Sequence, residues 1–286
     1  SVKNKKILVT GGAGFIGSNL VKYLLHKNEV HVLDNYLTGS TNNHESRAKY
    51  IDGNCNEILE IFSDISFDYI FHFGEYSRVE QSLNEPYFVF NNNGSIINII
   101  KYCELNSTKL IYSCSSTIFN DIDNNSTSLS PYTASKSMNL KLIKDMCDWR
   151  NIDYSIVYFY NVYGSNEISV GKYATVVAKF IELKRNGNTT APVSLPGTQT
   201  RNFTHINDII DGIILAAKFG SGDGYGIGSD EAFNILDLCK MLELEPIFYK
   251  SSISNRMSSP LNTKNIKDLG WAPNHDLFSY IKEMDL

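Results

Sequence analysis

The sequence predicts an α/β fold, a doubly wound parallel sheet followed by a smaller C-terminal lobe. Strand-like and helix-like segments alternate through the first half of the chain, which is typical of a parallel sheet covered by helices on both faces. The 286 residues suffice for one large α/β domain with an added lobe. We expect residues 1–165 to form the sheet domain and residues 166–286 to form mainly the lobe, with some segments returning to the sheet domain.

Apolar periodicity and the breakers between periodic segments predict the individual elements. After residue 165 the pattern becomes mixed, and we expect the glycine-rich stretch 220–228 to belong to the lobe that caps the C-terminal edge of the sheet. Connections are expected at 35–46, 121–130 and 186–197. Strands are expected near 5–10, 30–34, 69–73, 109–114 and 154–160. Helices are expected near 15–27, 86–106, 132–150 and 170–186.

A glycine-rich segment from Thr10 to Gly17 joins the first expected strand to the first expected helix. This strand–turn–helix context is the one that a dinucleotide-binding fingerprint needs. Gly11 permits the tight turn, Gly14 lets a pyrophosphate approach bare backbone, and Gly17 lets the helix pack close to the strand. The phosphates then accept hydrogen bonds from free N–H groups at the helix N-terminus. The segment therefore predicts a Rossmann dinucleotide-binding domain.

Asp34 ends the second expected strand. It follows Gly17 at close to the spacing of about 20 residues at which an acidic side chain binds the ribose 2′-hydroxyl of a dinucleotide. A carboxylate at that place also repels a 2′-phosphate. The expected cofactor is therefore NAD rather than NADP.

The bulk composition excludes several classes of partner. The net charge is −5 without a basic stripe, so we expect no nucleic-acid partner. No apolar stretch approaches the ~20 residues of a membrane span, and we expect neither a membrane partner nor a signal peptide. The five cysteines are scattered without metal spacing and indicate reduced thiols. We expect a cytoplasmic protein without a bound metal.

A second motif places Tyr132 and Lys136 four residues apart near the start of an expected helix. Residues at i and i+4 share one helix face, so the phenol and the ammonium can point into one site. A phenol has a pKa near ~10, and a neighbouring cation favours its ionised form. The pair can therefore take a proton from a substrate hydroxyl. The spacing also occurs by chance on exposed helix turns, and it gains weight from Ser115, whose hydroxyl follows an expected strand and could align the reacting oxygen.

These motifs resemble those of the extended short-chain dehydrogenases/reductases, specifically the nucleotide-sugar epimerase/dehydratase family and within it UDP-glucose 4-epimerase-like enzymes. The resemblance covers nearly the whole chain and includes the glycine loop, Leu33-Asp34-Asn35 and the segment 71–74. It implies that Ser115, Tyr132 and Lys136 are catalytic and that a bound NAD is contacted by Gly11, Gly14, Phe15, Ile16, Gly17, Asp34, Asn35, Asn54, Phe73, Gly74, Asn91, Tyr132 and Lys136.

The resemblance also implies a second ligand, a nucleotide-diphospho-sugar. Asn161 stands in the segment whose asparagine contacts substrate phosphate, and Arg201 and Arg256 stand in the segments whose guanidiniums bind the diphosphate. Relatives of this family commonly form dimers through two long helices, here 86–106 and 132–150. The residues expected to contact the sugar nucleotide are Glu75, Ser116, Thr117, Asn161, Lys172, Arg201 and Arg256.

Two departures from the family pattern shape the expected activity. The 4,6-dehydratases carry an Asp-Glu pair where this chain has Ser116 and Thr117, and hydroxyls cannot supply that acid–base chemistry. Glu75 replaces a small apolar residue, and it could bind a sugar hydroxyl, act as a second acid or base, or form an ion pair with Arg78. Epimerisation at C4 is therefore the expected reaction. The alternatives are a 4-dehydrogenase or 4-keto reductase, a 4,6-dehydratase, and a non-catalytic NAD-binding sensor.

Overall fold

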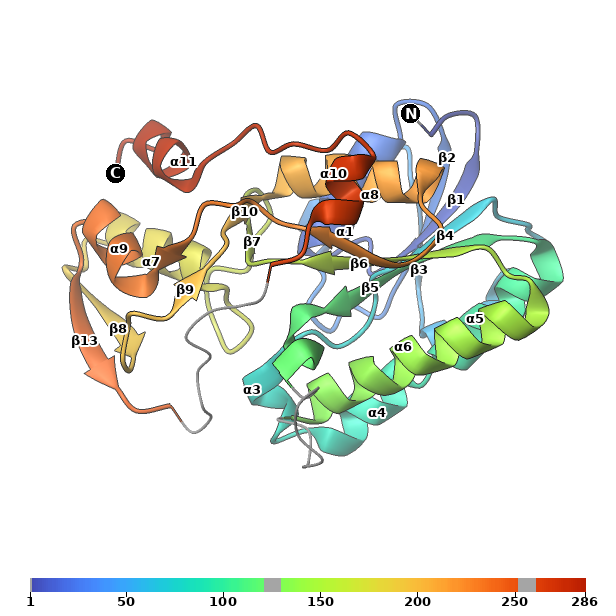
Figure 1. Cartoon of the computed structure of the whole chain (residues 1–286), viewed down its shortest axis with the longest axis horizontal. Coiled ribbons are helices and arrows are strands. Elements are labelled where there is room, and N and C mark those ends of the chain that lie inside the picture. The colour runs from blue at the N-terminus through green and yellow to red at the C-terminus, as the bar shows by residue number, and fades with distance from the viewer. Residues whose placement is uncertain (1, 121–129, 252–260) are drawn as a thin grey trace.

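The computed structural model describes residues 2–120, 130–251 and 261–286. Its centre is a parallel seven-stranded sheet (Figure 1) with the order β11-β6-β5-β4-β1-β2-β3. The order reverses between β1 and β4, and ligands bind at the carboxyl ends of the strands at such a switch point. The strands are β1 (Lys6–Thr10), β2 (Glu29–Asp34), β3 (Lys49–Asp52), β4 (Tyr69–His72), β5 (Lys109–Ser115), β6 (Tyr154–Phe159) and β11 (Gly222–Ile227).

Helices cover both faces of this sheet because alternate strand residues point to opposite sides. On one face, Val9 and its neighbours pack against α1 (Phe15–Leu24), α8 (Ile206–Phe219) and α10 (Lys264–Asp268). On the other face, Leu8 and its neighbours pack against α2 (Ile58–Ile61), α5 (Ile96–Asn106) and α6 (Pro131–Arg150). The predicted α/β class is confirmed.

The expected helices are present with three changes of boundary. The segment 86–106 forms two helices, α4 (Pro86–Asn93) and α5, with a break at Gly94 and Ser95. The segment 170–186 is helical only in α7 (Val176–Arg185). The helix expected at 15–27 ends at Leu24. Short helical turns occupy parts of the connections, namely η1 (Thr41–Asn43), η2 (Cys55–Glu57), α3 (Val79–Ser82) and η3 (Ser116–Asn120).

A second core lies among the residues after 165, where α7, α9 (Ile235–Met241) and α11 (Leu277–Glu283) pack together. The expectation of a plain connection at 186–197 is wrong, because β8 (Thr190–Ser194) pairs in parallel with β13 (Glu245–Tyr249). Pro192 within β8 hides the strand from sequence patterns, but proline is tolerated in an edge strand. Two more short pairs join β7 (Val162–Tyr163) to β10 (Thr204–His205) and β9 (Thr200–Arg201) to β12 (Phe233–Asn234).

The glycine-rich stretch 220–228 does not belong to the smaller lobe. It contains β11, the edge strand of the main sheet, which pairs with β6. Its glycines allow a close approach of another segment, since a Cβ on Gly226 would lie 2.2 Å from the carbonyl oxygen of Asn262. Among the described residues, no helix combines the length and apolar character that crossing a membrane requires.

Candidate active site

A cavity of about 610 Å³ opens at the carboxyl ends of the strands. Every residue that the sequence predicted to bind the cofactor lines it, and so do Ser115, Ser116, Thr117 and Asn161. The lining comes from the glycine loop, the ends of β2, β4 and β5, the start of α6 and the segment after β6. The fold therefore brings residues that are up to 160 positions apart into one site.

The glycine loop is shaped by its lack of side chains. Gly11 has a φ of +71°, and a Cβ there would lie 2.7 Å from the carbonyl oxygen of Phe73. A Cβ on Gly17 would lie 2.2 Å from the carbonyl oxygen of Gly11, so the first turn of α1 touches the loop directly. No side chain caps the N-terminus of α1 at Gly14. Its free N–H groups and helix dipole suit an anionic phosphate.

Asp34 ends β2 beside this loop. Its carboxylate accepts hydrogen bonds from the backbone N–H groups of Ala13 (3.0 Å) and Tyr36 (2.8 Å). Burial raises the pKa of Asp34, and the two backbone hydrogen bonds partly oppose that rise. The carboxylate also lines the cavity. The loop and Asp34 together therefore fit the pyrophosphate and the adenosine ribose of NAD.

The hydroxyl of Ser115 is held by its neighbours at the end of β5. Its Oγ lies 2.8 Å from Oγ1 of Thr117 and accepts the backbone N–H of Thr117 at 3.2 Å. Thr133 of α6 in turn donates to Oγ1 of Thr117 at 3.2 Å. This chain of hydroxyls fixes the oxygen of Ser115 relative to the helix that carries Tyr132.

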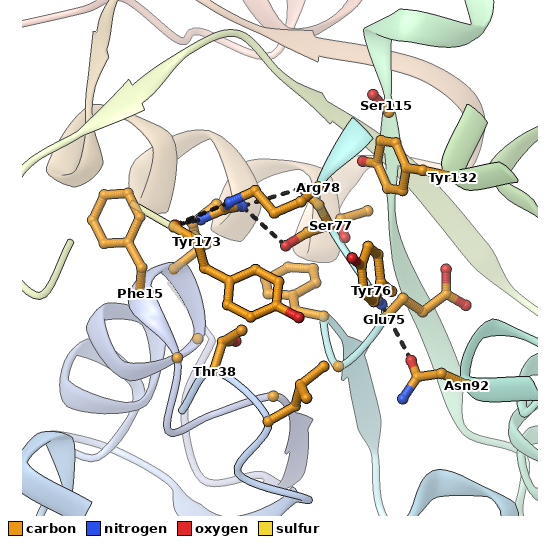
Figure 2. A pocket seen from close by; sticks show the side chains of 18 of the residues that line it. Phe15, Thr38, Glu75, Tyr76, Ser77, Arg78, Asn92, Ser115, Tyr132 and Tyr173 are labelled. Atoms are coloured by element: carbon orange, nitrogen blue, oxygen red, sulfur yellow. Dashed lines mark hydrogen bonds between the residues drawn. The ribbon is translucent and has the colours of Figure 1, made fainter. Parts of the chain in front are cut away.

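Tyr132 lies in the first turn of α6, which Ser130 caps by accepting the N–H of Thr133 at 3.1 Å. Only 8% of the residue is exposed, yet within the described residues its hydroxyl has no hydrogen-bond partner. Figure 2 shows the Tyr132 ring and Ser115 among the side chains that line the cavity. The phenol therefore presents its hydroxyl to a ligand.

Lys136 lies one turn further along α6 and is buried. Its Nζ donates to Oε1 of Glu75 at 2.8 Å and to the carbonyl oxygen of Ser113 at 2.9 Å. The same atom lies 6.0 Å from the centre of the Tyr132 ring. An ammonium has three N–H donors, so one donor is left for the cavity that Lys136 lines.

The carboxylate of Glu75 does not pair with Arg78, so that alternative for its role is wrong. The carboxylate is 1% exposed. Figure 2 shows it turned away from Arg78. Besides Lys136, its partners are the hydroxyl of Tyr112 (2.5 Å), Nδ2 of Asn139 (3.0 Å) and Nε2 of His72 (3.2 Å).

Charge and burial act against each other in this cluster. Burial alone would raise the pKa of Glu75, but the charge of Lys136 and the contact with His72 hold it well below its usual range. Burial would lower the pKa of Lys136, but Glu75 raises it above its ordinary value. Burial and the carboxylate of Glu75 both raise the pKa of Tyr112. Glu75 and Lys136 therefore form a charged, buried ion pair directly behind Tyr132.

Arg78 lines the cavity, and the sequence analysis named it only as one alternative partner of Glu75. Its Nε and Nη2 donate to the carbonyl oxygen of Tyr173 at 3.1 and 2.9 Å, and its Nη1 donates to Ser77. In residues 2–120, 130–251 and 261–286, no carboxylate forms an ion pair with it. Burial lowers its pKa. A guanidinium that lines the cavity and forms no ion pair within the described residues suits an anionic ligand.

Two of the basic residues expected to contact the sugar nucleotide, Lys172 and Arg201, are outside the lining of the cavity. Lys172 has a side chain that is 55% exposed and pairs with Glu85 at 2.9 Å, outside the lining. Arg201 lies in β9 opposite Phe233 of β12, where its Nη1 donates to the carbonyl oxygen of Thr200, and it is also outside the lining. For both residues the expected contact with the sugar nucleotide stays a prediction. Arg256 lies outside the described residues.

The chain matches the model of the NAD dependent epimerase/dehydratase family over residues 7–228. The "Putative UDP-glucose 4-epimerase" of Methanocaldococcus jannaschii is 28% identical over 97% of this chain and 96% of that protein. The dTDP-D-glucose 4,6-dehydratase of Dictyostelium discoideum is 30% identical over 83% of this chain and 61% of that protein. UDP-glucuronic acid decarboxylases of Arabidopsis thaliana also match.

The fold is shared with solved structures. The crystal structure of a UDP-glucose 4-epimerase from Thermotoga maritima with UDP-glucose superimposes with a TM-score of 0.90 and 25% identity, covering 97% of this chain and 96% of that chain. The relatives therefore agree on the family and differ in the reactions for which they are named.

Proposed function

The chain belongs to the NAD dependent epimerase/dehydratase family, and from that premise we propose that it is an NAD-dependent epimerase acting at C4 of a nucleotide-diphospho-sugar. The observation that carries the proposal is the cavity wall formed by Ser115, Tyr132 and Lys136 beside the glycine loop. These groups suit removal of a proton from a sugar hydroxyl next to a hydride acceptor. A UDP-hexose is the first substrate to test, because relatives named for such sugars match nearly the full chain.

The residues divide the reaction between them. NAD, which the glycine loop and Asp34 would hold, would supply the hydride acceptor and donor. Tyr132 takes the proton of the C4 hydroxyl as the carbonyl forms and gives it back when the carbonyl is reduced on its other face. Ser115 hydrogen-bonds the reacting oxygen and orients it toward Tyr132. Lys136 favours the ionised phenol by its charge, and its third N–H would be available to a bound cofactor. The reaction leaves no net redox change.

A dehydratase reaction is disfavoured by the carboxylates available. Elimination of the C6 hydroxyl needs an acid and a base near the sugar. Ser116 and Thr117 carry hydroxyls, and the carboxylates lining the described part of the cavity are Asp34, at the glycine loop, and Glu75, whose oxygens are occupied. Neither is placed to serve a sugar beside Tyr132.

We propose Arg78 as a ligand for an anionic group in the cavity, a phosphate of the dinucleotide or of the sugar nucleotide. Its guanidinium has no carboxylate partner within the described residues and lies in a half-buried position where charge-assisted hydrogen bonds are strong.

The test is to incubate the purified protein with NAD and, in turn, UDP-, dTDP-, GDP- and CDP-hexoses, and to follow the sugar by NMR. We expect formation of the C4 epimer from at least one substrate without release of NADH. Loss of the C6 hydroxyl would identify a dehydratase, and stoichiometric NADH in solution would identify a dehydrogenase. If every sugar stays unchanged, the proposed activity is wrong and the non-catalytic sensor remains.

We also propose that the protein is a homodimer through the face that α4 and α6 share. These helices pack against each other and carry exposed apolar side chains, among them Tyr87, which is 90% exposed, and Met138. Light scattering after size-exclusion chromatography should give a mass of twice the chain. A Tyr87→Asp/Met138→Asp variant should elute as a monomer, and a wild-type monomer would contradict the proposal.

A further inference from the structure

We propose that Glu75 is a positioning residue that orients the ammonium of Lys136 toward the cavity and, as its counter-ion, moderates how strongly that ammonium favours ionisation of Tyr132. The proposal deepens the proposed function and rests on it.

Two hydrogen bonds hold the ammonium of Lys136 in one direction. Its Nζ is bound on one side by Oε1 of Glu75 at 2.8 Å and on another by the carbonyl oxygen of Ser113 at 2.9 Å. With two donors used, the ammonium has one N–H left, and Lys136 lines the cavity, so that donor is available to a ligand there. A long flexible side chain is thereby restricted to one orientation before any ligand binds.

Glu75 itself is fixed by hydrogen bonds from two strands and one helix. Its Oε2 receives hydrogen bonds from Asn139 of α6 and His72 of β4, and its Oε1 receives one from Tyr112 of β5. All of these groups are buried. A carboxylate with every direction satisfied can stay ionised away from water. It therefore serves as a rigid support for Lys136 rather than as a substrate ligand.

The network also reaches the glycine loop. Thr10 directly precedes Gly11, its Oγ1 accepts the N–H of Gly74 at 3.0 Å, and it lies 2.7 Å from Nδ1 of His72. The assignment in which Thr10 donates to Nδ1 leaves Nε2–H of His72 to donate to Glu75. The support of Lys136 is thus continuous with the turn that cradles the cofactor.

The charge of Glu75 also acts on Tyr132 through Lys136. The titratable groups that face the pair are His72 from β4, Tyr112 and Cys114 from β5, Tyr132 from α6 and, further off, Cys55 from η2. Glu75 is the carboxylate among them, and its charge partly cancels that of Lys136 at Tyr132. An unopposed ammonium would favour the phenolate more strongly. Removing the charge of Glu75 should therefore let Tyr132 ionise at lower pH.

The experiment replaces Glu75 by glutamine, which keeps the size and a hydrogen-bonding oxygen. Ionisation of Tyr132 is followed in the NAD-bound protein by NMR of carbon-labelled tyrosine, with Tyr132→Phe identifying the resonance. We expect the Glu75→Gln protein to titrate about one pH unit lower than wild type. Glu75→Asp, which keeps the charge but withdraws it from Nζ, should shift in the same direction by less. An unchanged or upward titration in either variant would overturn the proposal.

Turnover supplies the second readout. The acid limb of the kcat–pH profile should move down with the NMR titration, while KM for the sugar stays within about two-fold, because Glu75 does not touch the substrate. Glu104→Gln, which breaks a distant exposed ion pair with Arg150, is the matched control and should change neither quantity. If wild-type protein epimerises no sugar, the proposed function fails alone, since the NMR titration still decides the role of Glu75.

Discussion

The two walls of the cavity are built by different means. The catalytic wall, formed by Ser115, Tyr132, Lys136 and Glu75, comes from β4, β5 and α6 and has a dense buried hydrogen-bond network behind it. The loop wall, formed by residues 161–175, is irregular apart from the short strand β7, and Arg78 donates to the carbonyl oxygen of its Tyr173. The sheet thus fixes the catalytic side chains before a ligand binds. Binding of the ligand, in contrast, depends on side chains from loops.

The largest expected effect is at the catalytic wall. Tyr132→Phe removes the proposed proton acceptor and should lower kcat by about a hundred- to ten-thousand-fold, the usual contribution of a general base. NAD binding, measured by calorimetry, should stay near wild type. Tyr87→Phe, on an exposed ring outside the cavity, is the control and should retain full activity. If Tyr132→Phe kept wild-type kcat, the catalytic wall would not carry the proposed proton acceptor.

Lys136→Met should lower the free energy of unfolding, because it leaves the carboxylate of Glu75 buried without its counter-ion. Such a loss costs about 3–5 kcal/mol. Urea unfolding should show it, and the double variant Glu75→Gln/Lys136→Met should recover most of the loss. A double variant as unstable as the single one would show that the pair is not the cause.

The pH dependence of this cost has a defined sign. The pKa of Glu75 is lowered from 4.5 to about 2 in the folded protein, so its stabilising contribution is complete above pH 4.5 and is lost as the pH falls toward 2. The difference in unfolding free energy between wild type and Lys136→Met should therefore narrow between pH 4.5 and 2. A constant difference over that range would contradict the ion pair.

On the loop wall a smaller effect is expected from Arg78→Gln. Loss of a charge-assisted hydrogen bond to a phosphate costs about 1.5–3 kcal/mol, or roughly ten- to a hundred-fold in affinity. Separate calorimetric titrations with NAD and with UDP-hexose would show which phosphate it binds. Arg78→Lys should restore part of the affinity, because it keeps the charge without the fork. Unchanged affinity for both ligands would remove Arg78 from the site.

The smallest effect is expected for Lys172→Met, since exposed ion pairs such as that with Glu85 contribute about 0–1 kcal/mol. The KM for the sugar nucleotide should stay within about two-fold of wild type. A much larger rise in KM would show that Lys172 contacts the sugar nucleotide. The loop wall would then be more extensive than the structure shows.

The same comparison explains what the sequence could predict. Gly11, Gly17 and Asp34 act through the backbone over a short stretch of chain, so their spacing alone predicts their places. The partner of Glu75 is Lys136, 61 positions away. The nearer Arg78 looked like the natural partner, but it lies on the opposite side of the turn. Sequence spacing carries no record of that geometry.

Elements outside the regular alternation were harder to predict for a related reason. In β8, Pro192 and the neighbouring turn residues give no alternating pattern, and the strand forms because β13 pairs with it across some 50 residues. The glycines of β11 resemble a loop, although they serve the close approach of residue 262 to an edge strand. In both segments, pairing with a distant strand determines the conformation, although the local composition favours a loop.

The return of β11 to the edge of β6 has a consequence for synthesis on the ribosome. Strands β1 to β6 emerge early, but the polar backbone edge of β6 stays open until residue 227 has left the exit tunnel. An open strand edge is a template for pairing with other chains. The edge of β6 therefore has no β11 to pair with while the 68 residues that follow Phe159, up to Ile227, are translated.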